Sequence, residues 1–261
     1  MTEMIVPTRW YNVATVLPFD LPPVLRADTD EPIGPHDFAW LYPLECLEIE
    51  CQAGKYKDAA WIDIPAPVYN AYTRYRPTPL VRAVGLERHL NTPAEIYFKR
   101  EDQNPGGSHK LNTALAQAHY AFSDGMCALV TDTGAGQWGA ALALACRALG
   151  LRTTVFMVQK SYDEKPYRRY LMAMVGAEVI SSPSERISIG RKVRQSSHDR
   201  NGSLGIGMAE AIEYVKSYEG TRLALGCMSY YAVLHQTIIG LETQAQLAEI
   251  NTSPDTLVGC V

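Results

Sequence analysis

A lysine at the start of a predicted helix is the first residue of this sequence that could do covalent chemistry. Lys110 lies in the stretch Gly-Gly-Ser-His-Lys-Leu-Asn at 106–112, and Ala, Leu and Gln follow it at 113–118, with Ser108 as the expected N-cap. Unpaired N–H groups and the positive end of the helix dipole disfavour a second positive charge there, which favours a neutral, nucleophilic amine. Such a lysine suits Schiff-base chemistry; the alternative is an ordinary surface lysine.

A glycine-rich turn follows the next predicted strand, at 128–131. Its sequence from Asp132 to Gly139 is Asp-Thr-Gly-Ala-Gly-Gln-Trp-Gly, and a helix of small residues comes after it. The spacing of the glycines matches a dinucleotide fingerprint, but the next strand leads into Gln159 and Lys160 instead of the acidic residue that this fingerprint needs. Backbone N–H groups at such a helix N-terminus bind anions, a carboxylate as readily as a phosphate. A purely structural tight turn is the alternative.

Together, the lysine and the turn are what a pyridoxal-phosphate enzyme acting on amino acids requires. The cofactor needs a Schiff-base lysine, and the substrate carboxylate needs a cradle that orients the bond to be broken. Both features come from successive strand-to-helix turns, so the sequence places them on the same edge of one sheet.

Short apolar runs alternate with helical patterns from about residue 76 onward. We expect strands at 128–131, 153–158, 178–180 and 256–261, and helices near 137–149, 163–175, 184–195, 207–218 and 234–249. Strands that alternate with crossover helices predict an α/β fold, with parallel sheets and helices on both faces. The run at 256–261 has the pattern of a buried parallel strand.

Proline and aromatic residues dominate the first 72 residues. Such proline density excludes long helices, so we expect an N-terminal arm at 1–72 that lays its aromatic side chains over a larger body, with one short helix at 44–49.

Composition and charge limit the function classes. The chain has 261 residues and a formal net charge of −4, with Lys and Arg scattered, which argues against a nucleic-acid ligand. No leader pattern and no apolar run of about 18 residues is visible, which argues against secretion and a membrane span. Six cysteines without a C-x-x-C pair suggest reduced thiols and a cytoplasmic protein. Cys46 and Cys51 have no companions at ligand spacing, so we expect no metal site.

The sequence resembles the β chain of tryptophan synthase, and most closely its second, divergent class. The likeness extends over the whole chain, in the family's order and spacing. The segments that carry it are Trp-Tyr-Asn at 10–12, Arg-Pro-Thr-Pro-Leu at 76–80, Gly-Ser-His-Lys at 107–110, the turn at 133–139, Lys-Pro-Tyr-Arg-Arg-Tyr at 165–170, Gly-Ser-Leu-Gly-Ile at 202–206 and Leu-His-Gln-Thr-Ile-Ile-Gly at 234–240.

This resemblance implies pyridoxal 5'-phosphate as cofactor and the tryptophan-synthase type of fold. Lys110 would hold the cofactor, His109 would lie beside its phosphate, and Gln137 near its ring hydroxyl. Asn112 would fix the cofactor ring or serve the backbone. The carboxylate of serine would bind at Thr133, Gly134, Ala135, Gly136, Gln137 and Trp138.

The reaction implied is formation of L-tryptophan from L-serine, or O-phosphoserine, and indole. Residues 73–124 would belong to the larger cofactor domain, 125–220 would form a mobile smaller subdomain, and 221–261 would return to the larger domain, which stays incomplete. A homodimer of the full-length protein and an association with a tryptophan synthase α chain are also implied.

Two features depart from the family pattern. Asp132 stands where the family usually has a glutamate as acid–base group, and a displacement of about 1 Å can cost on the order of a hundredfold in rate. The family's phosphate loop, which would follow 256–261, is not in the sequence, so we expect the carboxyl half to be absent and cofactor binding to be weak. The alternatives are a serine or threonine dehydratase-like β-elimination and a non-catalytic fragment.

Two further candidates have two interpretations each. His235 approaches the cofactor phosphate or is structural. The basic cluster Lys165, Arg168 and Arg169 meets a phosphorylated serine or forms a solvated face, and the second interpretation is favoured.

Overall fold

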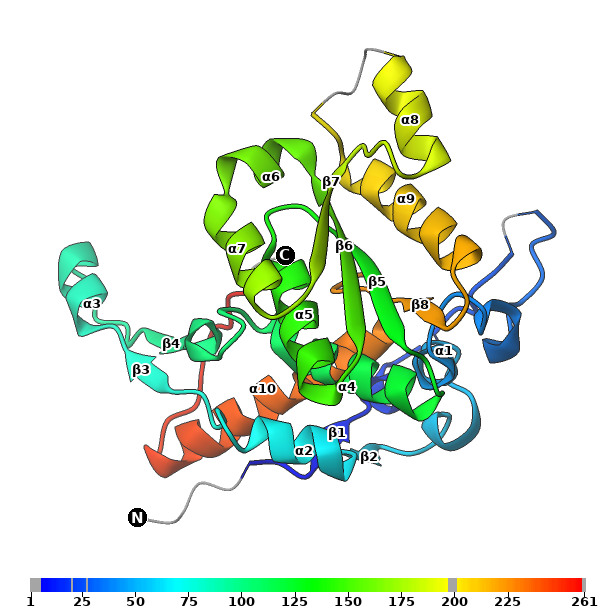
Figure 1. Ribbon diagram of the computed structural model, residues 1–261. Coiled ribbons are helices and arrows are strands. Elements are labelled where there is room, and N and C mark those ends of the chain that lie inside the picture. Colours follow the sequence, from blue (N-terminus) through cyan, green and yellow to red (C-terminus); the bar gives the residue numbers. More distant parts are fainter. Residues whose placement is uncertain (1–5, 20, 27, 197–200, 260–261) are drawn as a thin grey trace.

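A parallel sheet lies at the centre of the structure, a computed structural model that describes residues 6–19, 21–26, 28–196 and 201–259 (Figure 1). In this part of the chain its strand order is β7-β6-β5-β8, and every pairing is parallel. The strands are β5 (Ala128–Thr133), β6 (Arg152–Val158), β7 (Glu178–Ser182) and β8 (Thr221–Leu223). The first three confirm the predicted runs. The strand β8 was not predicted, because Thr-Arg-Leu is too short to show a period.

Helices cover both faces of this sheet, as the α/β prediction requires (Figure 1). On one face lie α5 (Gln137–Leu149), α6 (Gln159–Glu164) and α7 (Pro166–Met174); on the other lie α8 (Ser188–Gln195) and α9 (Leu204–Ser217). The helix predicted near 163–175 is divided in two, because Pro166 has no N–H to continue α6 and instead opens α7. The helix predicted near 207–218 begins earlier, where the Ser203 side chain accepts a hydrogen bond from the N–H of Ile206.

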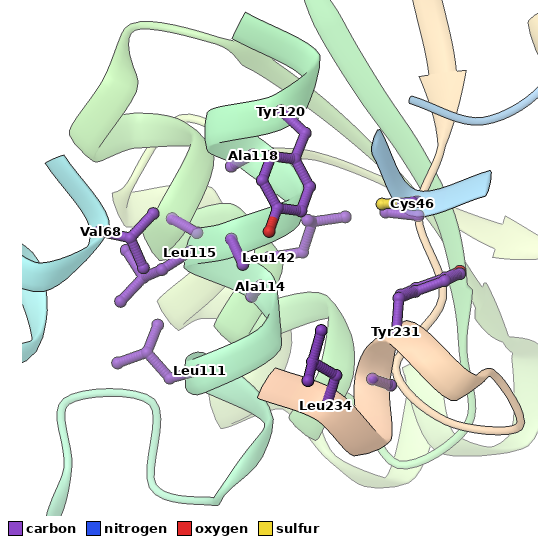
Figure 2. Packing of buried hydrophobic residues seen from close by; sticks show 14 of the residues in the cluster. Cys46, Val68, Leu111, Ala114, Leu115, Ala118, Tyr120, Leu142, Tyr231 and Leu234 are labelled. Atoms are coloured by element: carbon purple, nitrogen blue, oxygen red, sulfur yellow. The ribbon is translucent and has the colours of Figure 1, made fainter. Parts of the chain in front are cut away.

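The main apolar core lies between α4 (Lys110–Ser123), α5 and α10 (Tyr230–Glu249). Figure 2 shows Ala114 and Ala118 of α4 beside Leu142 of α5 and Leu234 of α10, and all four side chains are fully buried. Full burial of one leucine contributes about 1.5–3 kcal/mol. Because many of the buried residues of α4 and α5 are alanines, whose side chains are short, these two helices lie close together.

The N-terminal residues contact α10 through a short antiparallel pair, β1 (Arg9–Tyr11) and β2 (Trp61–Asp63). Trp10 is fully buried, with its ring centroid 4.7 Å from that of His235. The helix α1 (Leu44–Glu50) confirms the short helix predicted there, and α2 (Ala66–Tyr72) follows β2. Phe19 and Trp40 are 60% and 42% exposed, so for these two side chains the predicted covering of the body is wrong.

A second antiparallel pair, β3 (Leu80–Arg82) and β4 (Tyr97–Lys99), stands to one side with α3 (Val84–Leu90) (Figure 1). A buried ion cluster joins it to α10. The Arg76 guanidinium contacts Glu242 at 2.8 Å and Glu101 at 3.0 Å, and Lys99 contacts Glu242 at 2.8 Å. Because neither Arg76 nor Glu242 reaches solvent to any extent, each needs the other's charge.

The strand predicted at 256–261 is wrong for the residues that the structure describes, Thr256–Gly259. They adopt no regular structure, and Leu257 and Val258 are 81% and 94% exposed. An apolar run becomes a strand only where another strand can pair with it, and no described strand lies beside this one. Cys260 and Val261 lie outside the described residues.

The Arg76 cluster gives a stability prediction. We expect Arg76→Leu to lower the free energy of unfolding by about 3–5 kcal/mol, because it leaves the Glu101 carboxylate without a described ion-pair partner and the buried Glu242 carboxylate with Lys99 alone. Urea unfolding measures this loss. The matched control is Arg100→Leu, which breaks the exposed pair with Asp102 and should change stability far less. Equal losses in the two variants would contradict the account of the cluster.

Candidate active site

The glycine-rich turn lies at the carboxyl edge of the central sheet, and the predicted lysine lies beside it. The prediction that both loops follow strands of one sheet is wrong, because β4, the last strand before Lys110, belongs to the separate antiparallel pair. Lys110 is the first residue of α4, and the turn at 133–136 joins β5 to α5. The two helices are neighbours: a Cβ at Gly106, just before α4, would lie 3.7 Å from Cβ of Ala141 in α5. The structure therefore brings the two predicted halves of the site side by side.

One arginine contacts both loops. A Cβ at Gly107 would lie 3.7 Å from Nη1 of Arg168, and a Cβ at Gly136 would lie 2.8 Å from Cβ of the same arginine. Arg168 is on α7 and has no hydrogen bond or ion pair with any described residue. Its neighbour Arg169 instead lies over the rings of Tyr162 and Tyr170, at 4.4 and 5.4 Å. Only the fold separates the roles of these adjacent arginines, so the sequence analysis treated them as one cluster.

The loop before Lys110 is shaped by Asn104, a residue that the sequence analysis missed. Its Nδ2 donates to the carbonyls of Glu101 and Ser108 at 2.8 and 2.7 Å, and its Oδ1 accepts from the N–H of Gly106 at 2.9 Å. An Asn two residues before a glycine is a common turn signal that could have found it.

The predicted N-cap role of Ser108 is wrong. The N-cap position is His109, one residue later, and no side chain caps the helix there. Ser108 Oγ is buried and makes no hydrogen bond with any described residue. The N–H groups of Leu111 and Asn112 donate to the carbonyls of Ser108 and His109 at 3.5 and 3.2 Å, whereas the N–H of Lys110 has no acceptor among the described residues. The N-terminus of α4 therefore keeps a free hydroxyl and a free N–H beside the lysine side chain, as an anion site needs.

Lys110 and His109 differ in their surroundings. The Lys110 amine has no partner among the described residues. The pKa of His109 is lowered, first by desolvation and then by the positive charge of Lys110, so the imidazole favours its neutral form.

Asn112 is fully buried one turn along α4. Its Nδ2 donates to Glu101 Oε2 and Gln236 Oε1 at 3.2 and 3.0 Å, and its Oδ1 accepts from the Tyr75 hydroxyl at 3.0 Å. These bonds use both N–H groups and the oxygen, which favours the structural one of its two expected roles.

The glycine-rich turn presents unpaired backbone donors. Gly136 has φ +92°, a conformation that favours glycine, and α5 begins directly after it. The N–H of Gly139 donates to Thr133 Oγ1 at 3.3 Å, whereas the N–H groups of 134–138 have no acceptor among the described residues. Such a row of N–H groups at a helix N-terminus can bind a carboxylate.

The residues of the turn divide into exposed and inward-facing ones. Ala135 and Gln137 are exposed and Gly134 is half-buried. The Trp138 side chain points into the core, where its Nε1 donates to Thr131 Oγ1 at 2.7 Å. Trp138 can therefore offer a ligand only its backbone N–H, a point that the sequence motif did not reveal.

Asp132 is the last residue but one of β5, beside this turn, and is 8% exposed. Burial raises the pKa of its carboxyl to about 6, and no described side chain compensates. A Cβ at Gly207 of α9 would lie 3.2 Å from Cβ of Asp132, so the helix closes over it. Tyr42 of the N-terminal region is nearby, since its raised pKa has burial as the main cause and the charges of Glu50 and Asp132 as lesser ones.

His235 is structural. It is fully buried on α10, its Nδ1 lies 3.0 Å from Thr113 Oγ1 and its Nε2 lies 3.2 Å from the Tyr120 hydroxyl. Burial lowers its pKa to about 3, so the ring stays neutral. This location favours the structural role over a place beside a cofactor phosphate.

Two searches of the described residues were negative. They include no group of three or more His, Cys, Asp or Glu side chains that could hold a metal ion. None of their helices combines the length and the apolar character that crossing a membrane requires.

Comparison with known proteins gives consistent results. A sequence profile of the family described as "Pyridoxal-phosphate dependent enzyme" matches residues 72–261. The chain is 47% identical to tryptophan synthase beta chain 2 of Thermotoga maritima over 98% of its length and 59% of that protein. It is 48% identical to tryptophan synthase beta chain 2 of Aeropyrum pernix over 98% of its length and 57% of that protein. The chain thus spans less than two thirds of the length of these relatives.

Solved structures support the fold alone. The chain is similar to the diaminopropionate ammonia lyase of Escherichia coli in its apo form, with a TM-score of 0.54 and 19% identity over 72% of this chain and 51% of that one. It is also similar to a pyridoxal 5'-phosphate-dependent aspartate racemase, with a TM-score of 0.52 and 22% identity over 70% and 51%.

The buried carboxyl of Asp132 gives a pH prediction. Its pKa is about 6 in the folded chain against the ordinary 3.8, so its stabilising contribution is complete below about pH 4 and is lost as the pH rises through about 6. We expect Asp132→Asn to gain about 3 kcal/mol relative to wild type between pH 4 and pH 7. Urea unfolding across that range measures the gain, with the exposed Asp58→Asn as control. Parallel curves for wild type and Asp132→Asn would contradict the assignment.

Proposed function

The chain belongs to the family of pyridoxal-phosphate dependent enzymes, and from this membership we propose that it makes L-tryptophan by β-replacement. In this reaction indole replaces the β-oxygen group of L-serine or O-phosphoserine. The relatives that carry the name tryptophan synthase beta chain support the substrates, and the geometry of the site supports the chemistry.

The residues present fit the cofactor. Lys110 offers a free amine for a Schiff base, and Ser108 Oγ with the backbone N–H of Lys110 offers donors to a phosphate. From the family resemblance we expect His109 to contact the phosphate and Gln137 to contact the ring hydroxyl. When bound, the cofactor withdraws electrons from the amino acid, which lets bonds at its Cα and Cβ break.

Each remaining step has a residue of the chain to serve it. The turn at 133–138 binds and orients the substrate carboxylate through its free N–H groups. Lys110 moves the proton at Cα. Asp132, with its pKa near 6, can donate a proton to the leaving β-oxygen and later accept one from the indole nitrogen. Burial of Asp132 beneath α9 keeps water away from that proton transfer.

The observation that carries this proposal is the contact of one side chain, Arg168, with both loops. Because it contacts the positions of Gly107 and Gly136, the lysine and the carboxylate turn lie within one side-chain length of each other. One amino acid bound between the two loops could therefore reach both.

O-phosphoserine is the second candidate substrate, and Arg168 favours it. The Arg168 guanidinium lies between the lysine loop and the glycine-rich turn. It has no hydrogen-bond or ion-pair partner among the described residues. A planar guanidinium binds a phosphate through paired hydrogen bonds. The cluster thus divides into Arg168, which faces the site, and Lys165 with Arg169, which form the solvated face.

The domain movement is part of the same proposal. Residues 125–220 would move as the smaller subdomain against 73–124, with 221–261 returning to the larger domain and 1–72 as the arm. Arg168 supports this, because it belongs to the proposed subdomain and contacts the lysine loop. Closure would exclude water from the bound amino acid.

The assembly and location are proposed on the same basis. We expect a homodimer of the full-length protein from the family resemblance. The name tryptophan synthase beta chain, which the relatives carry, suggests an α chain as the candidate partner. A cytoplasmic location is supported by the five described cysteines, which form no disulfide.

A first test measures cofactor uptake by visible absorbance as pyridoxal 5'-phosphate is titrated to saturation. We expect a Schiff-base band for wild type and for the control Lys165→Ala, and none for Lys110→Ala, because only Lys110 has its amine in the site. With serine and indole, wild type should form tryptophan. Pyruvate without tryptophan would indicate β-elimination instead, and a folded wild type without a band would contradict the proposal.

A second test separates the two amino-acid substrates. We expect Arg168→Gln to raise KM for O-phosphoserine about ten- to a hundredfold, because a charged hydrogen bond contributes about 1.5–3 kcal/mol, and to change KM for serine little. Steady-state kinetics with both substrates measures this. Arg169→Gln is the matched control, since that guanidinium lies over two tyrosine rings. Equal effects of Arg168→Gln on both substrates would contradict phosphate recognition.

A further inference from the structure

A buried glutamine on the lysine helix binds the segment that follows β8. Gln117 of α4 is fully buried, and its Nε2 donates to the carbonyl of Leu225 at 2.7 Å. In return, the N–H of Leu225 donates to Gln117 Oε1 at 3.1 Å. The side-chain amide thus pairs with both backbone groups of one residue, so it fixes the position and the orientation of that residue relative to α4.

The other side of Gln117 is fixed as well. Its Nε2 also donates to Thr113 Oγ1 at 2.9 Å, and Thr113 Oγ1 lies 3.0 Å from His235 Nδ1. The Tyr120 hydroxyl lies 3.2 Å from the second nitrogen of His235. Every hydrogen-bonding atom of the Gln117 amide is used, and a buried polar network that is fully satisfied holds a single arrangement.

The segment that Gln117 binds, residues 224–226, contacts residues at both ends of the carboxylate turn. Thr131 Oγ1 donates to the carbonyl of Ala224 at 2.7 Å and accepts from Trp138 Nε1 at the same distance. A Cβ at Gly226 would lie 2.5 Å from Cδ2 of Trp138, so the indole rests directly on that glycine. Of the residues on either side of Leu225, Gly226 therefore contacts the Trp138 side chain directly, and Ala224 is linked to it through Thr131.

Lys110 and Gln117 share one face of α4. Residues seven apart on a helix are two turns apart and nearly aligned, about 10 Å along the axis. Lys110 places the amine at the N-terminal end of this face. Gln117, two turns further along, binds the segment that contacts the carboxylate turn.

We propose that Gln117 is a positioning residue that sets the carboxylate turn relative to the Lys110 amine. It acts through Leu225, Gly226 and Trp138 and touches neither substrate nor cofactor. The part of this inference that concerns the substrate rests on the proposed function, whereas the mechanical part does not.

The mechanical part is tested by hydrogen exchange on the cofactor-free chain. Gln117→Met keeps the volume and removes both bonds to Leu225. We expect backbone exchange to rise about tenfold or more at the hydrogen-bonded amides of Ala224 and Leu225 and at those that follow the turn, Gly139 and Ala140. The reason is that an unpaired buried amide or carbonyl costs about 1–3 kcal/mol. Tyr120→Phe is the matched control, because it removes one bond from the same network and leaves Leu225 paired. The exchange rates of Gln117→Glu should lie between those of wild type and Gln117→Met, because this variant keeps the acceptor for the Leu225 N–H.

The substrate part is tested with pyridoxal 5'-phosphate and L-serine. We expect Gln117→Met to leave the dissociation constant of the cofactor within about twofold of wild type and to raise that of serine about tenfold, both measured from the Schiff-base absorbance. Tyr120→Phe should change neither.

The outcomes separate this inference from the proposed function. Faster exchange confined to Ala224 and Leu225, without a change at Gly139 and Ala140, would overturn the inference, as would equal effects of Gln117→Met and Tyr120→Phe. Equal weakening of cofactor and serine binding by Gln117→Met would also overturn it, because that pattern indicates a general loss of structure. If wild type takes up no cofactor, the proposed function fails, and the exchange measurement alone decides whether Gln117 supports the turn.

Discussion

The close packing of α4 against α5 is the constraint on which the rest of this site depends. The contact uses small residues, among them Gly106, Ala114 and Ala141, and a Cβ at Gly106 would already lie 3.2 Å from Cβ of Leu111. Larger side chains here would separate two helix N-termini that have to meet. The packing therefore delivers a free amine from one helix and a row of free N–H groups from the next to the same place. Neither helix alone offers more than a general anion site.

Burial raises the pKa of the acid–base group, Asp132, and also makes its ionised form unfavourable. Asp132 is the last residue but one of β5, a strand whose residues are all buried, and α9 covers it. No described cation lies beside it, and the same desolvation that raises its pKa makes its charged form unfavourable. Arg76 is the opposite case, because its buried charge is paired with the carboxylates of Glu101 and Glu242. A titratable group kept without a partner at the edge of the sheet is typical of a functional site, whereas the paired cluster serves the fold.

Local signals in the sequence predicted the elements and the two loops, because strand runs, glycine turns and helix starts depend on neighbouring residues. The same logic failed where a distant contact decides. Ser108 has the residue type of an N-cap, yet Asn104 fixes its carbonyl and the helix starts one residue later. The run at 256–261 has the composition of a strand but finds no described strand to pair with. Arg168 and Gln117 gain their importance from residues about 30 to 110 positions away, which no period or motif encodes.

The central claim is that Lys110 and the turn at 133–138 form one amino-acid site. Its most direct test is borohydride reduction of the cofactor-loaded chain, followed by peptide mass spectrometry. The account predicts a pyridoxyl group on Lys110, protection of Lys110 when serine is added first, and loss of that protection, without loss of the label, in Gly136→Ala, whose Cβ would lie 2.8 Å from that of Arg168. A label on another lysine, or a Lys110 label that serine does not affect in wild type, would contradict it.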